Sequence, residues 1–220
     1  MIDGSFEGRC AFILENTRLQ TPPHTPELRL HLADEITPIW QMTEEALAEI
    51  GLPPPFWAFA WAGGQALARY VLDHREVVAG KRVLDFASGS GIVAIAARMA
   101  GAGEVMACDI DGFCGAALAV NARANGVEVA FTDDNLLDRP PPDVAVILAG
   151  DICYEKPMTD QVMAWLTRAR TAGTTVLIGD PGRSYFPRSG LTRLAQYQVA
   201  TTRELEDQEV KKTSVWTLDT

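Results

Sequence analysis

The stretch Val83-Leu84-Asp85-Phe86-Ala87-Ser88-Gly89-Ser90-Gly91 decides the fold of this chain. Its apolar beginning predicts a buried strand, and its end predicts a glycine turn that leads into an Ala- and Ile-rich helix. A carboxylate, that of Asp85, stands near the end of the strand. A turn of this kind between a parallel strand and a helix is typical of loops that bind nucleotide cofactors.

Two classes of cofactor are compatible with the glycine spacing. The pattern Gly89-x-Gly91-x-x-Ala94, followed by Asp109, matches the dinucleotide fingerprint of NAD-dependent oxidoreductases. In that fingerprint the first glycine directly follows the strand, whereas here Asp85 and three further residues intervene. The Asp85 carboxylate would also repel a pyrophosphate. S-adenosylmethionine carries an amino group and a sulfonium and has no phosphate, so the loop favours S-adenosylmethionine.

Strand and helix patterns alternate along the second half of the chain. Five strands of a parallel sheet are predicted at residues 82–86, 104–109, 127–131, 143–149 and 174–178. Helices are predicted at residues 90–100, 112–124 and 158–172. Two last strands, 197–205 and 213–218, flank the acidic stretch 206–208 and form a hairpin. We therefore predict an α/β protein with the Rossmann-like seven-stranded fold of class I methyltransferases, which has five parallel strands plus a C-terminal hairpin, with an N-terminal extension.

The beginning of the chain is expected to be organised differently. Residues 1–60 are predicted to form an N-terminal extension and aromatic lid, and residues 61–220 the methyltransferase domain. Residues 28–32 alternate as a strand does, and residues 43–50 predict a short helix. The aromatic run at residues 56–61 is followed by a predicted helix over about residues 64–73.

Composition restricts the partners and the compartment. A formal charge of −10 and a pI near 4.8 argue against nucleic acid or an anionic membrane as partners, since both need a basic surface. The four cysteines and three histidines show no metal-ligand spacing, so no metal site is predicted and the thiols are expected to be reduced. We see no signal peptide pattern and no run near the ~20 apolar residues of a membrane span. A cytoplasmic monomer is expected.

Three motifs together indicate a family. They are the aromatic run with Gly63-Gly64-Gln65-Ala66-Leu67-x-Arg69-Tyr70, the loop that contains Asp85, and Gly150-Asp151-Ile152-Cys153-Tyr154. With Asp109-Ile110-Asp111 and Ile178-Gly179-Asp180-Pro181-Gly182-Arg183, they resemble the seven-β-strand protein methyltransferases related to the electron transfer flavoprotein β-subunit lysine methyltransferase. The resemblance extends from about Pro53 to Trp216. It rests mainly on the Gly-Gly-Gln-Ala-Leu-x-Arg-Tyr and Gly-Asp-Pro-Gly-Arg strings, because loops like that of Asp85 are common.

The resemblance implies a set of cofactor-binding residues. The turn at Ser88, Gly89 and Gly91 would hold the methionine portion of S-adenosylmethionine, where a side chain would occupy ligand space. The Asp85 carboxylate would face the amino group of the cofactor, directly or through water. Asp109 would accept hydrogen bonds from the ribose hydroxyls, and a role in a turn or as an N-cap is its alternative.

Two further pairs are implied in the same way. Asp134 and Asn135 would contact the adenine edge, although an Asx turn explains them equally well. Trp61 and Gln65 resemble the family's cofactor lid, and an indole face attracts a sulfonium. Some neighbouring rings, such as that of Trp57, are expected to be core.

The motif Asp151-x-x-Tyr154 follows the fourth strand, at the sheet edge where open α/β sheets bind ligands. It matches the family's acid-x-x-aromatic signature. Methyl transfer to an amine is a direct displacement, and a free lysine with a pKa of about 10.4 is almost entirely protonated at neutral pH. We assign Asp151 to positioning of the substrate amine and Tyr154 to the wall of a lysine channel. A cap on the following helix is the alternative role for Asp151.

The resemblance thus predicts an S-adenosylmethionine-dependent protein-lysine N-methyltransferase that acts on the electron transfer flavoprotein β subunit. A methyltransferase of another protein, such as a ribosomal protein, would share every cofactor residue and stays open. Alternatives from other classes are an NAD-dependent oxidoreductase and a cofactor-binding module without catalysis.

Overall fold

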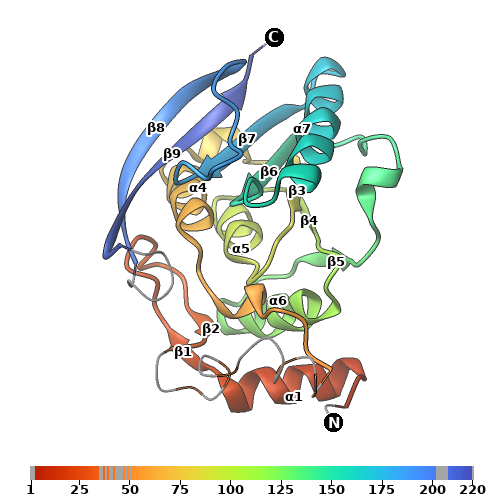
Figure 1. The fold of residues 1–220 in the computed structure, drawn as a ribbon, viewed down its shortest axis with the longest axis vertical. Helices are drawn as coiled ribbons and strands as arrows, with labels where there is room; N and C mark the ends of the chain where they lie inside the picture. Colours follow the sequence, from red (N-terminus) through yellow and green to blue (C-terminus); the bar gives the residue numbers. More distant parts are fainter. Residues whose placement is uncertain are drawn as a thin grey trace.

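The computed structural model describes residues 3–34, 37, 39, 42, 47, 49, 51–201 and 208–219. Its centre is a seven-stranded sheet (Figure 1). The strands of this sheet are β3 (Arg82–Phe86), β4 (Glu104–Cys108), β5 (Ala130–Thr132), β6 (Val146–Gly150), β7 (Thr175–Asp180), β8 (Leu191–Ala200) and β9 (Val210–Leu218).

The strand order is β5-β4-β3-β6-β7-β9-β8. The first five strands of this order are parallel, and β9 runs antiparallel to both of its neighbours, β7 and β8. The predicted class I methyltransferase fold, with five parallel strands and a terminal hairpin, is therefore confirmed. A dinucleotide-binding domain would continue in parallel, so the sheet also argues against the oxidoreductase alternative.

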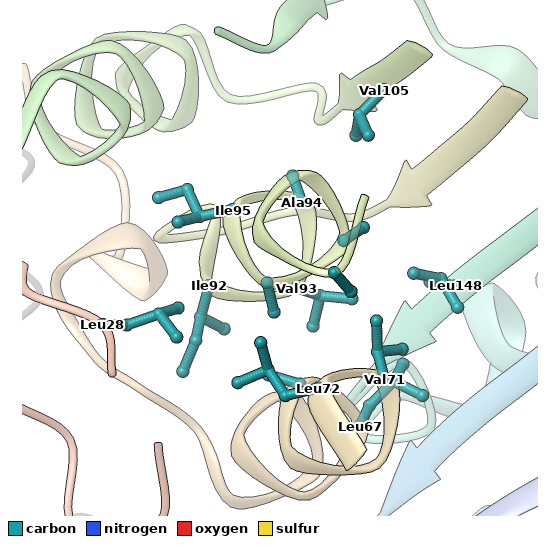
Figure 2. Packing of buried hydrophobic residues seen from close by; sticks show 14 of the residues in the cluster. Leu28, Leu67, Val71, Leu72, Ile92, Val93, Ala94, Ile95, Val105 and Leu148 are labelled. Carbon is teal, nitrogen blue, oxygen red and sulfur yellow. The ribbon is translucent and has the colours of Figure 1, made fainter. Parts of the chain in front are cut away.

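Side chains of the central strands alternate between two cores, as the pleat of a sheet requires. On one face Val83 and Leu148 pack under α4 (Ala62–Asp73), α5 (Ile92–Met99) and part of α6 (Gly112–Ala124). Figure 2 shows this core, in which Ile92 and Val93 of α5 face Leu67, Val71 and Leu72 of α4. On the other face Leu84 and Phe86 pack under α7 (Lys156–Thr171). The sheet is thus covered on both faces, which explains the unbroken apolar runs in its strands.

The N-terminal residues pack along the length of α6. They contain α1 (Phe6–Asn16) and a small antiparallel pair, β1 (Arg18–Gln20) with β2 (Leu30–Leu32). A third core joins Ile13, Trp57 and Ala58 to α6 residues such as Phe113 and Ala117. This core is shared by the predicted extension at residues 1–60 and the predicted domain at residues 61–220. The boundary between them stays a prediction. The 3-10 helix η1 (Phe56–Ala58) carries the chain from this core to α4; the other 3-10 helices are η2 (Arg75–Val77) and η3 (Leu136–Asp138).

Several predicted boundaries are wrong. The helix predicted at residues 90–100 begins at Ile92, because Gly91 has a left-handed φ of 79°. The helix predicted at about residues 64–73 begins at Ala62, and the strand predicted at residues 28–32 covers Leu30–Leu32. β5 is shorter than predicted, and β8 begins six residues before the predicted start at residue 197, with a bulge between Arg193 and Ala195.

Some features were missed or lie outside the described residues. Helix α1 and strand β1 have no counterpart among the predictions. Most of the helix predicted at residues 43–50, and residues 202–207 with most of the predicted hairpin turn, lie outside the described residues. In the part of the chain that is described, no helix has the length and apolar character needed to cross a membrane.

Candidate active site

A cavity of about 410 Å³ opens at the carboxyl ends of β3, β4 and β6. Its size is typical of pockets for small-molecule ligands, and its lining is largely apolar, with Phe86, Leu136 and Leu137 among the walls. The cavity brings together seven residues that the sequence predicted for the site: Trp61, Gly89, Asp109, Asp134, Asn135, Asp151 and Tyr154. The other four predicted residues, Gln65, Asp85, Ser88 and Gly91, are buried behind it and do not line it.

Asp85 is buried and contacts the helix that follows the turn. The carboxylate is 1% exposed, and its Oδ2 accepts a hydrogen bond from the Ala94 amide at 2.9 Å. Because burial penalises the charged form, the pKa of Asp85 rises to about 8. In this structure the carboxyl group therefore holds the first turn of α5, and its predicted contact with a cofactor amino group stays a prediction.

Gly91 has two structural reasons to be a glycine. A Cβ at this position would lie 2.4 Å from the Leu118 side chain of α6, and the residue has a left-handed φ. The left-handed φ and the close approach of Leu118 both favour glycine here, and the predicted contact with a cofactor stays a prediction. Gly89, with φ +50°, does line the cavity, and its amide donates to Asp109.

Two buried polar side chains sit behind the cavity with one atom unpaired among the described residues. Gln65 donates through Nε2 to the Ala60 carbonyl at 2.7 Å, and its Oε1 has no partner there. The Ser88 hydroxyl has none either, while the Ser88 amide donates to the Cys108 carbonyl. A role in cofactor binding stays a prediction for each residue.

Asp109 joins the turn to the end of β4. Its Oδ2 accepts from the Gly89 amide at 3.0 Å and its Oδ1 from the Asp111 amide at 3.1 Å. A carboxylate can accept about four hydrogen bonds, so Asp109 keeps acceptor capacity toward the cavity that it lines. The predicted role toward ribose hydroxyls is compatible with this geometry.

Asp134 and Asn135 form the expected turn and also line the cavity. Asn135 caps η3 by accepting from the Leu137 amide at 3.2 Å, and Asp134 pairs with Arg139 at 3.0 Å. Beside them, Leu136 and Leu137 give the cavity an apolar wall that could hold a flat ring. The turn and the predicted adenine contact are therefore not exclusive.

Asp151 caps a helix, but not the one that was expected. Its Oδ2 accepts from the Gly63 and Gly64 amides at the start of α4, whereas the N-cap of the following helix, α7, is Glu155. Its backbone has φ +56°, an uncommon conformation for a residue with a side chain and one that functional sites often hold. Asp151 thus lies in the cavity wall, fixed by backbone amides of a separate element.

The Gly-Gly-Gln string and two strand glycines allow this capping contact. A Cβ on Gly63 would lie 2.3 Å from the Gly179 carbonyl oxygen, and a Cβ on Gly150 would lie 2.9 Å from the Gly64 Cα. The start of α4 therefore rests directly on the backbones of β6 and β7. This close approach brings the α4 amides within reach of Asp151 and explains why the narrow motifs are rich in glycine.

Arg183 completes the site and was not among the predicted site residues. Its guanidinium pairs with Asp151 Oδ1 through Nε at 2.9 Å and Nη2 at 2.6 Å. The guanidinium carbon also lies 5.7 Å from the centre of the Trp61 ring. Asp180 anchors this segment by accepting from the Gly182 and Arg183 amides, and burial raises the pKa of Asp180 to about 7. The Gly-Asp-Pro-Gly-Arg string is thus a turn that delivers a cation to the cavity.

Aromatic side chains form the mouth. Tyr154 is 48% exposed, and its ring lies 5.6 Å from that of Phe56, which in turn lies 6.0 Å from Trp61. Trp61 is held by a hydrogen bond from Nε1 to the Phe56 carbonyl at 3.0 Å. Burial raises the pKa of Tyr154 above its ordinary value. These aromatic side chains line the same cavity as Asp151.

The thiols that line the cavity are unsuited to nucleophilic chemistry. Burial raises the pKa of Cys108 to about 12 and raises that of Cys114 as well. Within the described ranges, no three His, Cys, Asp or Glu side chains are grouped as a metal site would need.

Comparison with known proteins places the chain in a family. The model of the ribosomal protein L11 methyltransferase (PrmA) family matches residues 65–177. The electron transfer flavoprotein beta subunit lysine methyltransferase of Xenopus laevis is 39% identical over 215 residues, which cover 95% of this chain and 86% of the relative. The protein of the same name from Danio rerio is 38% identical over 212 residues, covering 93% and 81%.

A solved structure shares the fold. Magnesium protoporphyrin IX methyltransferase from Synechocystis PCC 6803, solved with bound SAM, aligns with a TM-score of 0.51 over 71% of this chain and 78% of that chain, at 14% identity. The order of the seven strands and the sequence identity over most of the chain both indicate a methyltransferase. The chain is a class I methyltransferase and belongs to the electron transfer flavoprotein beta subunit lysine methyltransferase family.

Proposed function

We propose that this methyltransferase uses S-adenosylmethionine to methylate lysine side chains of the electron transfer flavoprotein beta subunit. The observation that carries the proposal is the Asp151 carboxylate, which is 8% exposed and lies in the wall of an apolar cavity with aromatic side chains at its mouth. An amine on a long apolar stem is the ligand that such a channel suits, because the stem is buried while the amine reaches the carboxylate.

The cavity residues fit the cofactor. Asp109 has acceptor capacity for a pair of hydroxyls, Leu136 and Leu137 offer an apolar wall for a flat base, and the Gly89 turn leaves room beside them. The buried, unpaired Gln65 Oε1 and Ser88 Oγ are polar atoms behind the lid and the turn. The acidic lining of Asp109, Asp111 and Asp134 suits a cationic ligand and disfavours a pyrophosphate.

Asp151 and Tyr154 each have a definite task in the methyl transfer. S-adenosylmethionine supplies a methyl group on a cationic sulfonium. Asp151 holds the amine in line, and its negative charge stabilises the positive charge that the amine nitrogen acquires. The apolar channel past Tyr154 removes water from the lysine, which lowers the pKa of the amine and favours its neutral, nucleophilic form.

The names of the relatives support the flavoprotein as substrate. The proteins that cover more than nine tenths of this chain are named for that substrate. The ribosomal protein L11 methyltransferase model covers only residues 65–177. We further propose that the protein acts in the cytoplasm as a monomer and that the segment before Trp61 serves as a lid.

Transfer of labelled methyl from S-adenosylmethionine to purified electron transfer flavoprotein tests the substrate, with ribosomal protein L11 assayed in parallel. We expect label on the beta subunit and none on L11. Label on L11 alone would overturn the substrate assignment. Titration with S-adenosylhomocysteine and with NADH tests the cofactor class separately, and binding of NADH alone would overturn the proposal.

A further inference from the structure

The position that a substrate amine would take is filled by a cation of the chain itself. Arg183 makes two contacts with Asp151 Oδ1, at 2.9 and 2.6 Å, and lies over the Trp61 ring. A carboxylate and an aromatic face are the two groups that favour an alkylammonium ion in a protein site. The guanidinium therefore uses the same chemistry at the same place as the lysine proposed above.

Asp151 is oriented by other groups. The Gly63 and Gly64 amides hold its Oδ2, and neither glycine lines the cavity, whereas Arg183 does. The oxygen on the cavity side is thus the one that Arg183 contacts. Removal of the guanidinium from Oδ1 would leave the carboxylate in place, because its other oxygen stays fixed to the start of α4.

Arg183 also has the means to move. Its side chain is 22% exposed, and it projects from the segment between β7 and β8, which contains no helix or strand over residues 181–190. Asp180 holds the Arg183 amide at 2.8 Å, so the backbone is anchored near the site while the long side chain can rotate. The guanidinium can therefore leave Asp151 without a change in the sheet.

We propose that Arg183 is an internal competitor that occupies the amine position at Asp151 until a docked substrate lysine displaces it. This inference rests on the proposed function, since it concerns the amine site of that reaction. A free amine can bind Asp151 only after the guanidinium has left, and it makes no further contacts that would offset the cost. Its apparent affinity is therefore lower than it would be at an unoccupied Asp151. A lysine on a docked protein has the rest of the protein interface to drive the displacement. Arg183 thus makes the enzyme specific for lysines on a folded protein partner over free lysine or small amines.

The experiment uses n-butylammonium, a mimic of the lysine side chain, as the probe. Its dissociation constant is measured by ligand-observed NMR for the full-length protein and for Arg183→Gln, with and without S-adenosylhomocysteine. We expect Arg183→Gln to bind the probe about fivefold more tightly or better, because the competing charge is gone. Arg193→Gln is the matched control, since Arg193 also lies over an indole ring, that of Trp216 at 5.8 Å, but outside the cavity.

The outcomes separate competition from simple support. Equal or weaker binding of the probe by a folded Arg183→Gln protein would overturn the inference, because a supporting residue can only lose affinity when removed. The result does not depend on methylation of the flavoprotein, so failure of the substrate assignment is visible separately in the labelling assay. Failure of the cofactor assignment is likewise visible separately, as absence of S-adenosylhomocysteine binding.

A second measurement needs no variant. The Arg183 Nε proton donates to Asp151 in the free protein and is expected to exchange slowly with water. Saturation of the wild-type protein with the flavoprotein substrate should accelerate this exchange at least severalfold, as the lysine replaces the guanidinium. An Nε signal that stays equally protected in the saturated complex would contradict displacement.

Discussion

Replacement of Asp151 separates its structural task from its chemical one. Asp151→Ala removes the acceptor for two backbone amides at the start of α4, and each buried donor without a partner costs about 1–3 kcal/mol. Asp151→Asn keeps an acceptor oxygen for both amides and loses the negative charge, and with it the ion pair to Arg183. We therefore expect Asp151→Ala to unfold more easily than Asp151→Asn by about 2–4 kcal/mol in urea.

The rate of methyl transfer is expected to depend on the negative charge of Asp151 and not on its hydrogen bonds to the start of α4. Asp151→Asn is expected to bind S-adenosylhomocysteine as the wild type does. In the wild type the Asp151 carboxylate oxygens contact the α4 amides and Arg183, so they are not assigned to the cofactor. Its kcat for methyl transfer should fall about 100-fold, the usual size of an electrostatic contribution at a reacting centre. The assays are calorimetric titration and transfer of labelled methyl to the flavoprotein. Full activity of Asp151→Asn would refute the amine role, and equal stability of the two variants would refute the capping role.

Three further predictions follow from single contacts. Gly179→Ala places a Cβ 2.1 Å from the Gly63 carbonyl oxygen and should lower the free energy of unfolding in urea by about 2–4 kcal/mol. Gly4→Ala, where a Cβ would have nothing within 4 Å, should leave the stability unchanged. Equal effects of the two substitutions would contradict the close packing of α4. Asp109→Asn should weaken S-adenosylhomocysteine about tenfold or more in calorimetry, because charged acceptors bind hydroxyls more strongly, and an unchanged affinity would remove Asp109 from the cofactor site. Burial raises the pKa of Asp85 from 3.8 to about 8, so its contribution to stability is present below pH 4 and is lost as the pH rises toward 8. Asp85→Asn should make the free energy of unfolding decline less steeply between pH 4 and pH 8. Asp180, with its pKa raised to about 7, contributes to the same decline and should leave part of it in the variant. An unaltered decline in Asp85→Asn would show that Asp85 does not contribute to it.

The fold was predictable because its signals are local. The apolar run that ends at Asp85, the glycine turn and the alternation of strand and helix all lie within short stretches of sequence. The boundaries that were predicted wrongly depend on distant residues. Helix α4 begins at Ala62, two residues earlier than predicted, where its first amides meet Asp151 eighty-eight positions along the chain. A pattern of propensities within one segment contains no such information.

The site was predictable in part for the same reason. Residues at strand ends, such as Asp109 and Asp151, were identified because parallel strands present their carboxyl ends at one edge. Arg183 lies at the same edge, after β7, and its Gly-Asp-Pro-Gly-Arg string was quoted as a family motif without a role for the arginine. Its contact with Asp151 joins segments that follow β6 and β7, which are neighbours in the sheet but lie more than thirty residues apart in the sequence. Gly91 was identified from the turn alone, and its close approach to Leu118, which lies on a separate helix, could not be read from that turn.

Mass spectrometry of the electron transfer flavoprotein after incubation with the enzyme and S-adenosylmethionine tests the central claim most directly. We predict that the beta subunit gains mass in steps of one methyl group, that fragmentation places these groups on lysine side chains, and that the alpha subunit is unchanged. The Asp151→Asn protein should leave the beta subunit unmodified over the same period. A beta subunit without added methyl groups, or with methyl groups on residues other than lysine, would contradict the account.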